Sequence, residues 1–429
     1  MFKRLLFIAV SFVFYESGFA YYSNDYAYLL LYKDKENLNY TQKGFQLGSF
    51  RVRPRLDLGE EYGSNVYKQD SHYYPIYDSF VSHLRPNADI LSDWNRHLLN
   101  FQINTDFASF NTQPDRNNYN DLRSRVDSRI DLMRNSFFDV GVAYNNSHED
   151  RSSPDQIFGL TPTVFNEKTL DIFYNHRFNR VSIRPGILTG IYSYKDIPAL
   201  DGHMLYMSTR DSVQYIPSIQ IGYQIQPKYE LFFRLIKKDI FYKYLVESNL
   251  QGLKYNRNST GYNLLSGIAF DFTDLITANL SLGYLQRHYI DDHLPAISGV
   301  NGFLSVRWFP TKLTTVKAMV ARDIDETTQA GVSGIFVTNF HLLLEHELLR
   351  NLIIKLNLKT TYNDFKGFDS DFYSDNRTDL TLASGISAKY LVNRNFSLSA
   401  SYLNEGRTSN YTASDYDYNQ LMFSVSFKL

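Results

Sequence analysis

Apolar and polar residues alternate along the chain in stretches of about ten residues, the length of a membrane-crossing strand. In residues 50–62, one set of alternate positions carries apolar side chains: Phe50, Val52, Pro54, Leu56, Leu58 and Tyr62. The positions between them begin with polar residues: Arg51, Arg53, Arg55 and Asp57. A helix would scatter both sets, whereas successive residues of a strand point to opposite sides. The pattern predicts a strand with one face toward lipid and one toward water.

The same alternation recurs in other parts of the chain. Residues 122–132 place Leu122, Val126, Ile130 and Leu132 on one face, together with Ser124 and Ser128. The opposite face carries Asp121, Arg123, Arg125, Asp127, Arg129 and Asp131. Further alternating stretches lie at residues 99–107, 138–144, 219–225, 264–272, 280–284, 316–320, 354–358 and 380–390. We therefore expect an all-β protein built from many long strands.

Short polar turns and longer polar stretches separate these strands in alternation. The turns are predicted near residues 94–95, 134–135, 179–180, 226–228, 273–274, 310–312, 350–351 and 393–394. The longer stretches include residues 145–165, 195–211, 246–261 and 364–378, and none is clearly long enough to fold inward as a constriction. This arrangement predicts a transmembrane antiparallel outer-membrane β-barrel with short periplasmic turns and long extracellular loops. It favours about eighteen strands, with sixteen as the alternative.

The two ends of the chain agree with export to the outer membrane. Lys3 and Arg4 precede an apolar run, and Gly18 and Ala20 occupy the positions that a signal peptidase reads. We expect residues 1–20 to be a signal peptide, residues 21–43 a periplasmic segment or partial plug, and residues 44–429 the barrel. The chain ends as an amphipathic strand on an apolar residue, Leu429, which resembles the terminal signal read by the barrel-insertion machinery.

Composition excludes several other classes of protein. The chain has 34 Tyr and 32 Phe but no Cys, which fits the aromatic girdles of a membrane barrel and leaves no disulfide or thiolate metal site. After the N-terminal run, no segment approaches the roughly 18 apolar residues of a spanning helix. The net charge of −1 argues against a nucleic-acid partner. A secreted soluble β-propeller is the architectural alternative, but no blade signature recurs.

Several short motifs resemble the second group of β-barrel porins, a family found beside genes for exopolysaccharide and capsule synthesis and export. The resembling positions are residues 44–50, Pro54, Leu56, residues 62–67, residues 84–86, Trp94, Arg96, His97, residues 149–155, Glu326, Thr327, Gly331 and Ser333. The resemblance spans nearly the whole chain after residue 20. It implies an outer-membrane pore connected with polysaccharide passage, and it carries no catalytic residues over.

The charged strand faces are the candidate functional residues. They are Arg51, Arg53, Arg55 and Asp57 on the first strand and Asp121, Arg123, Arg125, Asp127, Arg129 and Asp131 on the later one. Opposite charges two residues apart share one lumen face. Two interpretations remain open: a salt-bridge lattice that stiffens the wall, or a charged constriction that orders passing anions or acidic sugars.

Three functions fit the predicted barrel. The leading one is a pore for exopolysaccharide or capsular polysaccharide export, and the others are a general diffusion porin and a non-conducting structural or adhesive barrel. No spacing singles out a Ser–His pair, so we expect neither an enzyme nor a cofactor. The aspartates between residues 364 and 379 lack a calcium-loop pattern and predict solvated or lipopolysaccharide-bridging acidity. Expected partners are outer-membrane lipid and lipopolysaccharide, the insertion machinery, polysaccharide and export-complex components.

Overall fold

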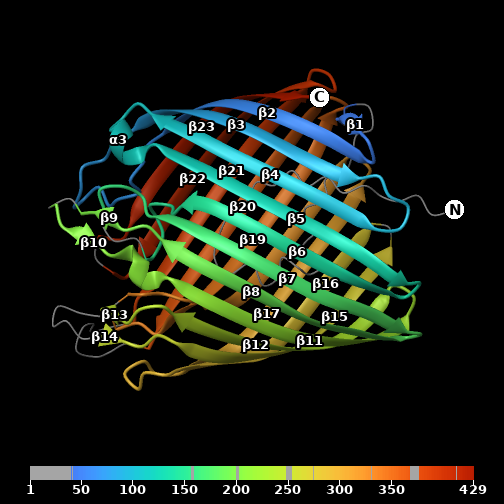
Figure 1. The fold of residues 1–429 in the computed structure, drawn as a ribbon. Coiled ribbons are helices and arrows are strands. Elements are labelled where there is room, and N and C mark those ends of the chain that lie inside the picture. Colours follow the sequence, from blue (N-terminus) through green and yellow to red (C-terminus); the bar gives the residue numbers. More distant parts are fainter. Residues whose placement is uncertain are drawn as a thin grey trace.

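The strands form one closed antiparallel barrel. The computed structural model describes residues 40, 42–155, 159–199, 202–247, 254–273, 275–329, 331–367, 376–411 and 413–429. Eighteen strands follow one another around the wall, and β2 pairs with β23 to close it (Figure 1). The predicted fold and the count of eighteen are therefore confirmed. The expected signal peptide lies outside the described residues, as does residue range 21–43 apart from Tyr40, Gln42 and Lys43.

The wall strands are long and similar in length. They are β2 (Phe50–Gly63), β3 (Ser79–Ser92), β4 (Leu98–Phe110), β5 (Tyr119–Met133), β6 (Ser136–His148), β7 (Val164–Phe178), β8 (Val181–Tyr194), β11 (Ser212–Gln226), β12 (Tyr229–Tyr242), β15 (Ser259–Thr273), β16 (Ile276–Tyr289), β17 (Ile297–Thr311), β18 (Thr314–Asp325), β19 (Gly334–Leu349), β20 (Leu352–Lys366), β21 (Thr378–Leu391), β22 (Phe396–Ser409) and β23 (Tyr416–Lys428). Such lengths suit strands that cross a membrane at a tilt.

All eight predicted turns connect neighbouring wall strands at one end of the barrel, and the long loops gather at the other end (Figure 1). We call these the turn end and the loop end; in outer-membrane barrels they face the periplasm and the exterior, respectively. Two of the turns contain Asn179 and Lys228 at positive φ, 54° and 74°. This conformation matches the twist of a tight hairpin, and Asn accepts it readily.

Short elements complete the two ends. The loop end carries α3 (Pro114–Asn117), η1 (Met207–Arg210) and two small hairpins, β9 (Ile197–Pro198) with β10 (Met204–Leu205) and β13 (Val246–Glu247) with β14 (Lys254–Tyr255). At the turn end, β1 (Phe45–Leu47) pairs with residues 50–52 of β2, beyond the point where β23 stops opposite Arg55. Gly44 precedes β1 with φ 65°, and a Cβ there would lie 2.3 Å from the Val52 carbonyl oxygen. Glycine at position 44 therefore lets β1 pair with the part of β2 that β23 does not reach.

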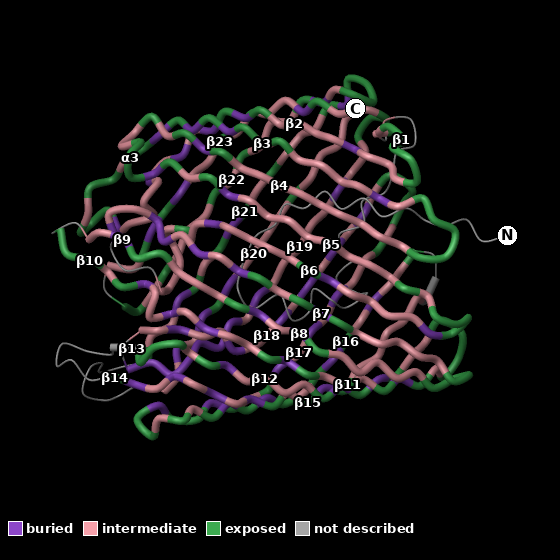
Figure 2. Tube along the Cα trace, viewed as in Figure 1, coloured by how far each residue is buried: buried purple, intermediate pink, exposed green. Residues whose placement is uncertain are grey.

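The wall has an apolar outside and a polar inside. Large apolar side chains such as Leu58, Phe107, Leu282 and Phe423 are exposed on the outer surface, whereas charged residues such as Arg53 are buried. Exposed and buried residues are interspersed along the strands, and the turns are exposed (Figure 2). The period of two predicted from the sequence thus sets which side chains meet lipid and which meet the lumen.

Candidate functional site

The candidate site is the lumen, and the predicted charged residues line it as ion pairs along single strands. On β5, Arg125 Nε lies 2.7 Å from Asp127 Oδ1, and Arg129 Nε lies 2.9 Å from Asp131 Oδ1. Asp121 and Arg123 line the cavity at the loop end, with a 4.0 Å separation between their charged atoms. The pairs join residues two apart on one face, as expected for a strand.

On β2 the predicted residues share the lumen face with Glu61, which lines the cavity nearer the loop end. Arg55 Nε lies 2.8 Å from Asp57 Oδ2, and Arg53 is only 5% exposed. Arg51 lies next along this face, at the turn end. The register of β2 to β5 aligns Arg53 with Arg125, so the charged residues of these two strands overlap along the wall. Their internal pairing supports the lattice interpretation, while a role in ordering passing anions stays a prediction.

A contact that the sequence analysis missed ties β5 to β7 across the intervening β6. Arg125 Nη2 donates to Asp171 Oδ1 at 3.0 Å, and Asp171 is almost fully buried. Gly141 of β6 lies beneath this bridge, where a Cβ would fall 2.4 Å from both charged atoms. A glycine inside a predicted strand is the signal that could have indicated such a close approach.

A second missed cluster surrounds His83 on the lumen face of β3. Its Nδ1 lies 2.9 Å from Asp106 and its Nε2 lies 3.2 Å from Glu61. Arg85 also contacts Asp106 at 3.0 Å, and the Tyr418 hydroxyl donates to Glu61 at 3.0 Å. Arg85 Nη2 also lies 2.9 Å from His83 Nδ1, so the ring is surrounded by two carboxylates and a guanidinium. This network joins β3 to β2, β4 and β23.

The loop between β6 and β7 folds into the barrel, contrary to the expectation that no loop forms a constriction. We call residues 149–155 the inward loop. Its first residue, Glu149, accepts two hydrogen bonds from Arg210, at 2.8 and 2.6 Å. Its next residue, Asp150, lies 3.0 Å from Lys68, which is also 2.8 Å from Glu405 of β22. Length in sequence was a poor guide because these polar contacts, rather than loop size, direct the segment inward.

The far end of the inward loop reaches the opposite wall. Six wall strands separate β7 from β18 in one direction, and eight separate β19 from β6 in the other. Asp155 nevertheless accepts hydrogen bonds from the Thr327 hydroxyl and from the Thr328 N–H, the latter at 3.0 Å. Gln329 donates to the Pro154 carbonyl, and Arg407 donates to the Ser152 carbonyl at 2.9 Å. The inward loop therefore crosses the lumen.

The receiving segment is the tip of the β18–β19 hairpin, residues 323–337, which separates from β17 while its β19 side stays paired with β20. β17 pairs with β18 only as far as Gly302 opposite Arg322, whereas β18 and β19 stay paired to Asp325 opposite Ile335. Beyond the split, Phe336 packs with Leu285 and Ile297 of the β16–β17 hairpin. The hairpin tip and the β16–β17 hairpin thus bury these apolar side chains against each other, which stabilises the bent position of the tip.

Arg257, which lies between β14 and β15, anchors this hairpin tip. Its side chain is 1% exposed and donates to the carbonyls of Gln329 and Val332, each at 2.8 Å, and to that of Ser333 at 3.5 Å. A buried guanidinium satisfied by several acceptors is stable, whereas losing one side would leave buried polar groups without partners. The two segments that meet in the lumen, residues 149–155 and 326–333, are among those quoted above for the porin resemblance.

Between these segments and the wall lies a cavity of about 570 Å³. Its charged lining is balanced, with eight basic and eight acidic residues among those described. The basic ones are Lys68, Arg85, Arg123, Arg151, Arg210, Lys238, Lys359 and Arg407, and the acidic ones are Glu61, Asp121, Glu149, Asp150, Asp155, Asp325, Glu326 and Glu405. Tyr119 stacks on His148 at the same surface, with ring centroids 3.8 Å apart.

Comparison with known proteins assigns the family. The sequence model of the family described as "Putative beta-barrel porin 2" matches residues 38–429. The chain belongs to this family. A search of curated proteins finds no match to this porin. The family and the fold are those of outer-membrane channels.

Three solved structures are similar to this porin at low sequence identity. OpdO of Pseudomonas aeruginosa is 13% identical, with a TM-score of 0.44 over 88% of this chain and 97% of that one. P. aeruginosa OccK2 (OpdF), solved in complex with glucuronate, is 11% identical, with a TM-score of 0.45 over 90% and 100%. A BenF-like porin from Pseudomonas fluorescens Pf-5 is 9% identical, with a TM-score of 0.44 over 88% and 99%.

Two features are absent from the described part of the porin. Among those residues, no helix is long and apolar enough to cross a membrane. The same residues contain no group of three or more potential metal ligands. Of the aspartates predicted to be solvated or lipopolysaccharide-bridging, Asp379 pairs with Arg377 at 2.7 Å, and residues 368–375 lie outside the described residues.

The porin should keep its inward loop in place across the neutral pH range. Burial by the surrounding protein raises the pKa of Asp150 and lowers the pKa of Lys68. The attraction between the two charges outweighs burial at both groups. Hydrogen bonds from Ser152 add to this effect at Asp150, and the charge of Glu405 adds to it at Lys68. The pKa of Asp150 is therefore lowered and that of Lys68 raised. Burial lowers the pKa of Arg151 to about 10, which leaves it charged at neutral pH.

These directions set the pH window. The contribution of Asp150 is complete above the ordinary aspartate pKa, about 4, and is lost as pH falls further. The contribution of Lys68 is complete below the ordinary lysine pKa, about 10, and is lost as pH rises through its raised value. We expect hydrogen–deuterium exchange at the backbone of residues 150–154, corrected for the intrinsic exchange rate at each pH, to stay constant between about pH 5 and pH 9. A rise in the corrected exchange inside that window would contradict this assignment of charges.

Proposed function

We propose that this porin is a narrow diffusion channel for small hydrophilic solutes. The observation that carries the proposal is the meeting of two inward segments, residues 149–155 and 326–333, within the barrel. An eighteen-stranded barrel alone would leave a wide aqueous path. The cavity of about 570 Å³ beside these segments has instead the size of a small-molecule site.

The balance of charge in the cavity favours solutes without a large net charge. With eight basic and eight acidic side chains in the lining, neither cations nor anions meet a field of one sign. At least half of these groups, as in the contacts of Lys68 and Arg210, pair with one another. Polar solutes that exchange hydrogen bonds with such a wall, including sugars, fit it best. We therefore infer weak ion selectivity.

Polysaccharide export is the second candidate. It is supported by the family resemblance, since such porins are found beside genes for polysaccharide synthesis and export. A polymer could not thread past the contacts between Asp155 and the hairpin tip, so export requires the two segments to separate. A non-conducting surface barrel is the third possibility, and it requires that the segments never open a continuous path.

Reconstitution of the full chain tests the proposal. In planar bilayers we expect a small conductance with a cation-to-anion permeability ratio near one, and in liposome swelling we expect a monosaccharide to enter faster than a trisaccharide. An empty-liposome preparation with the same detergent history is the control. Equal entry of long oligosaccharides would favour the export candidate. Absence of conductance, with heat-modifiable gel mobility showing a folded barrel, would favour the structural one.

A further inference from the structure

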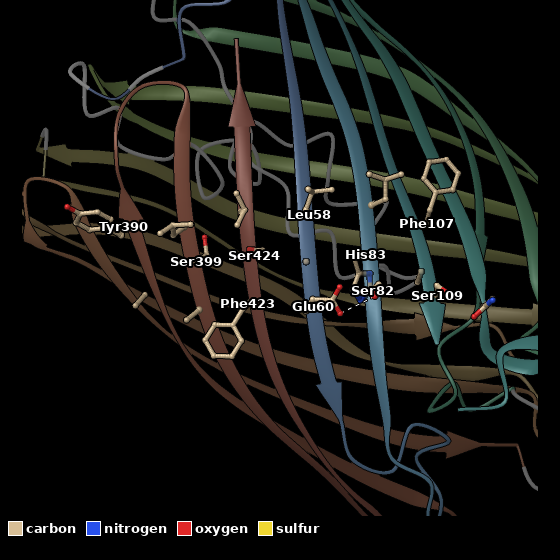
Figure 3. Close-up of a pocket in the computed structure, with 18 of the residues that line it drawn as sticks. Leu58, Glu60, Ser82, His83, Phe107, Ser109, Tyr390, Ser399, Phe423 and Ser424 are labelled. Atoms are coloured by element: carbon tan, nitrogen blue, oxygen red, sulfur yellow. Dashed lines mark hydrogen bonds between the residues drawn. The ribbon is translucent and has the colours of Figure 1, made fainter. Parts of the chain in front are cut away.

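A groove of about 1030 Å³ lies on the outer wall, across the seam where β2 meets β23 (Figure 3). Its walls include Leu58, Phe107 and Phe423, which are 41%, 41% and 56% exposed. These side chains belong to the apolar set of their strands, which faces lipid. The groove therefore opens to the membrane on the outer side of the wall, whereas the lumen cavity lies on its inner side.

The end of the groove toward the loops is polar. Glu60 of β2, Ser82 of β3 and Ser109 of β4 stand opposite one another in the strand register. The Ser82 hydroxyl donates to Glu60 Oε2 at 3.0 Å, as the dashed line in Figure 3 shows, between Phe423 on one side and Phe107 on the other. All three residues are exposed. A carboxylate on the lipid-facing wall is costly without a partner, which marks this end for a specific contact.

Aromatic residues place this polar row just below the membrane interface. Tyr62 and Phe80 lie one layer nearer the loops on the same strands, with ring centroids 5.3 Å apart. The Tyr62 hydroxyl donates to Asp78 of the outer loop at 2.8 Å. Such rings mark the level of lipid headgroups. Glu60 therefore lies where a headgroup joins its acyl chains.

The other end of the groove is apolar and runs toward the turns. Ala388 of β21 and Ala400 of β22 are opposite each other, and Leu398 and Tyr390 form the next layer toward the turn end. The two small alanines leave a hollow between larger side chains, which suits a slender, flexible hydrocarbon chain. The groove thus has a polar end at the outer leaflet and an apolar remainder.

We propose that this groove binds a glycolipid of the outer leaflet, with its acyl chain over Ala388 and Ala400 and its sugar hydroxyl or amide N–H donating to Glu60. Among the residues that line the groove, Glu60 is the one carboxylate, neither Lys nor Arg occurs, and the His83 ring contacts Glu61 and Asp106 on the lumen side. A phosphate headgroup would meet the carboxylate without a cation between them. A second copy of the chain, related by twofold symmetry about the groove, would bring two Glu60 carboxylates together in a medium of low dielectric constant. A neutral hydrogen-bond donor, such as a sugar hydroxyl or an amide N–H, avoids both the repulsion between phosphate and carboxylate and the repulsion between two carboxylates.

Native mass spectrometry of the detergent-solubilised full chain tests this proposal. The probe is a glucosamine-based glycolipid with amide-linked acyl chains, compared with phosphatidylglycerol of the same chain length. We expect wild type to retain the glycolipid preferentially, and Glu60→Leu to reduce its retention roughly tenfold relative to phosphatidylglycerol. Ala400→Phe, which fills the hollow, should reduce retention of the glycolipid to a similar extent.

Matched controls lie on wall strands outside the groove. Ser266→Leu and Ala318→Phe make comparable changes at outward positions of β15 and β18 and should leave retention unchanged. Heat-modifiable mobility checks that each barrel is folded, and Ala400→Phe decides the outcome if Glu60→Leu fails to fold. Equal retention by wild type and both groove variants would overturn the proposal. So would equal retention of phosphatidylglycerol by wild type, or a dimer of the chain that Glu60→Leu abolishes.

Discussion

Deletion of residues 150–154 should raise the single-channel conductance several-fold and admit trisaccharides into proteoliposomes. These residues belong to the inward loop, which spans the lumen from Glu149 to the β18–β19 tip. They lie outside the ladder of β6 and β7, whose pairing ends at His148 opposite Val164. Their loss should widen the path without removing wall hydrogen bonds, because conduction depends on the narrowest cross-section.

A shorter deletion provides the control. Asp292 and His293 lie in the loop between β16 and β17, and no residue of that loop lines the lumen cavity among those described. Their removal should leave conductance at the wild-type value. If deletion of residues 150–154 gave wild-type conductance in a barrel that is folded by heat-modifiable mobility, the inward loop would not be the constriction.

A disulfide between the inward loop and the hairpin tip should abolish any brief high-conductance events. The chain has no cysteine, so Asp155→Cys with Thr327→Cys would form its only disulfide. These positions are chosen because their side chains are in hydrogen-bond contact in the structure. The natural contact comprises a few hydrogen bonds, each contributing about 0.5–1.5 kcal/mol. Such a contact opens a small fraction of the time, whereas a covalent bond does not.

The measurement is single-channel recording under oxidising conditions, followed by addition of reductant. We expect high-conductance events to vanish on oxidation and return on reduction, while the basal conductance stays unchanged. Each single-cysteine variant should show no response to oxidation. Events that persist in the fully oxidised double variant would show that opening does not require Asp155 to leave Thr327, and the export candidate would then need another route.

Alternation along each strand was enough to predict the wall. Adjacent positions such as Asp57 and Leu58 point to opposite sides of the strand, and a strand has only two faces, so local sequence determines which side meets lipid. Pairs two residues apart, such as Arg55 with Asp57 and Arg125 with Asp127, follow from the same geometry. The count of eighteen strands followed because each short turn marks a change of direction.

Contacts between distant segments could not be predicted in this way. Arg125 with Asp171 depends on the strand order and on the absence of a side chain at Gly141. Asp155 meets Thr327 only after the barrel closes and brings opposite walls within reach of one loop. The sequence by itself therefore determined the wall, its two faces and the barrel class, because periodicity is a local property. Only the tertiary structure decided how the lumen is narrowed and where the outer groove lies, because both depend on side chains that closure of the barrel brings together.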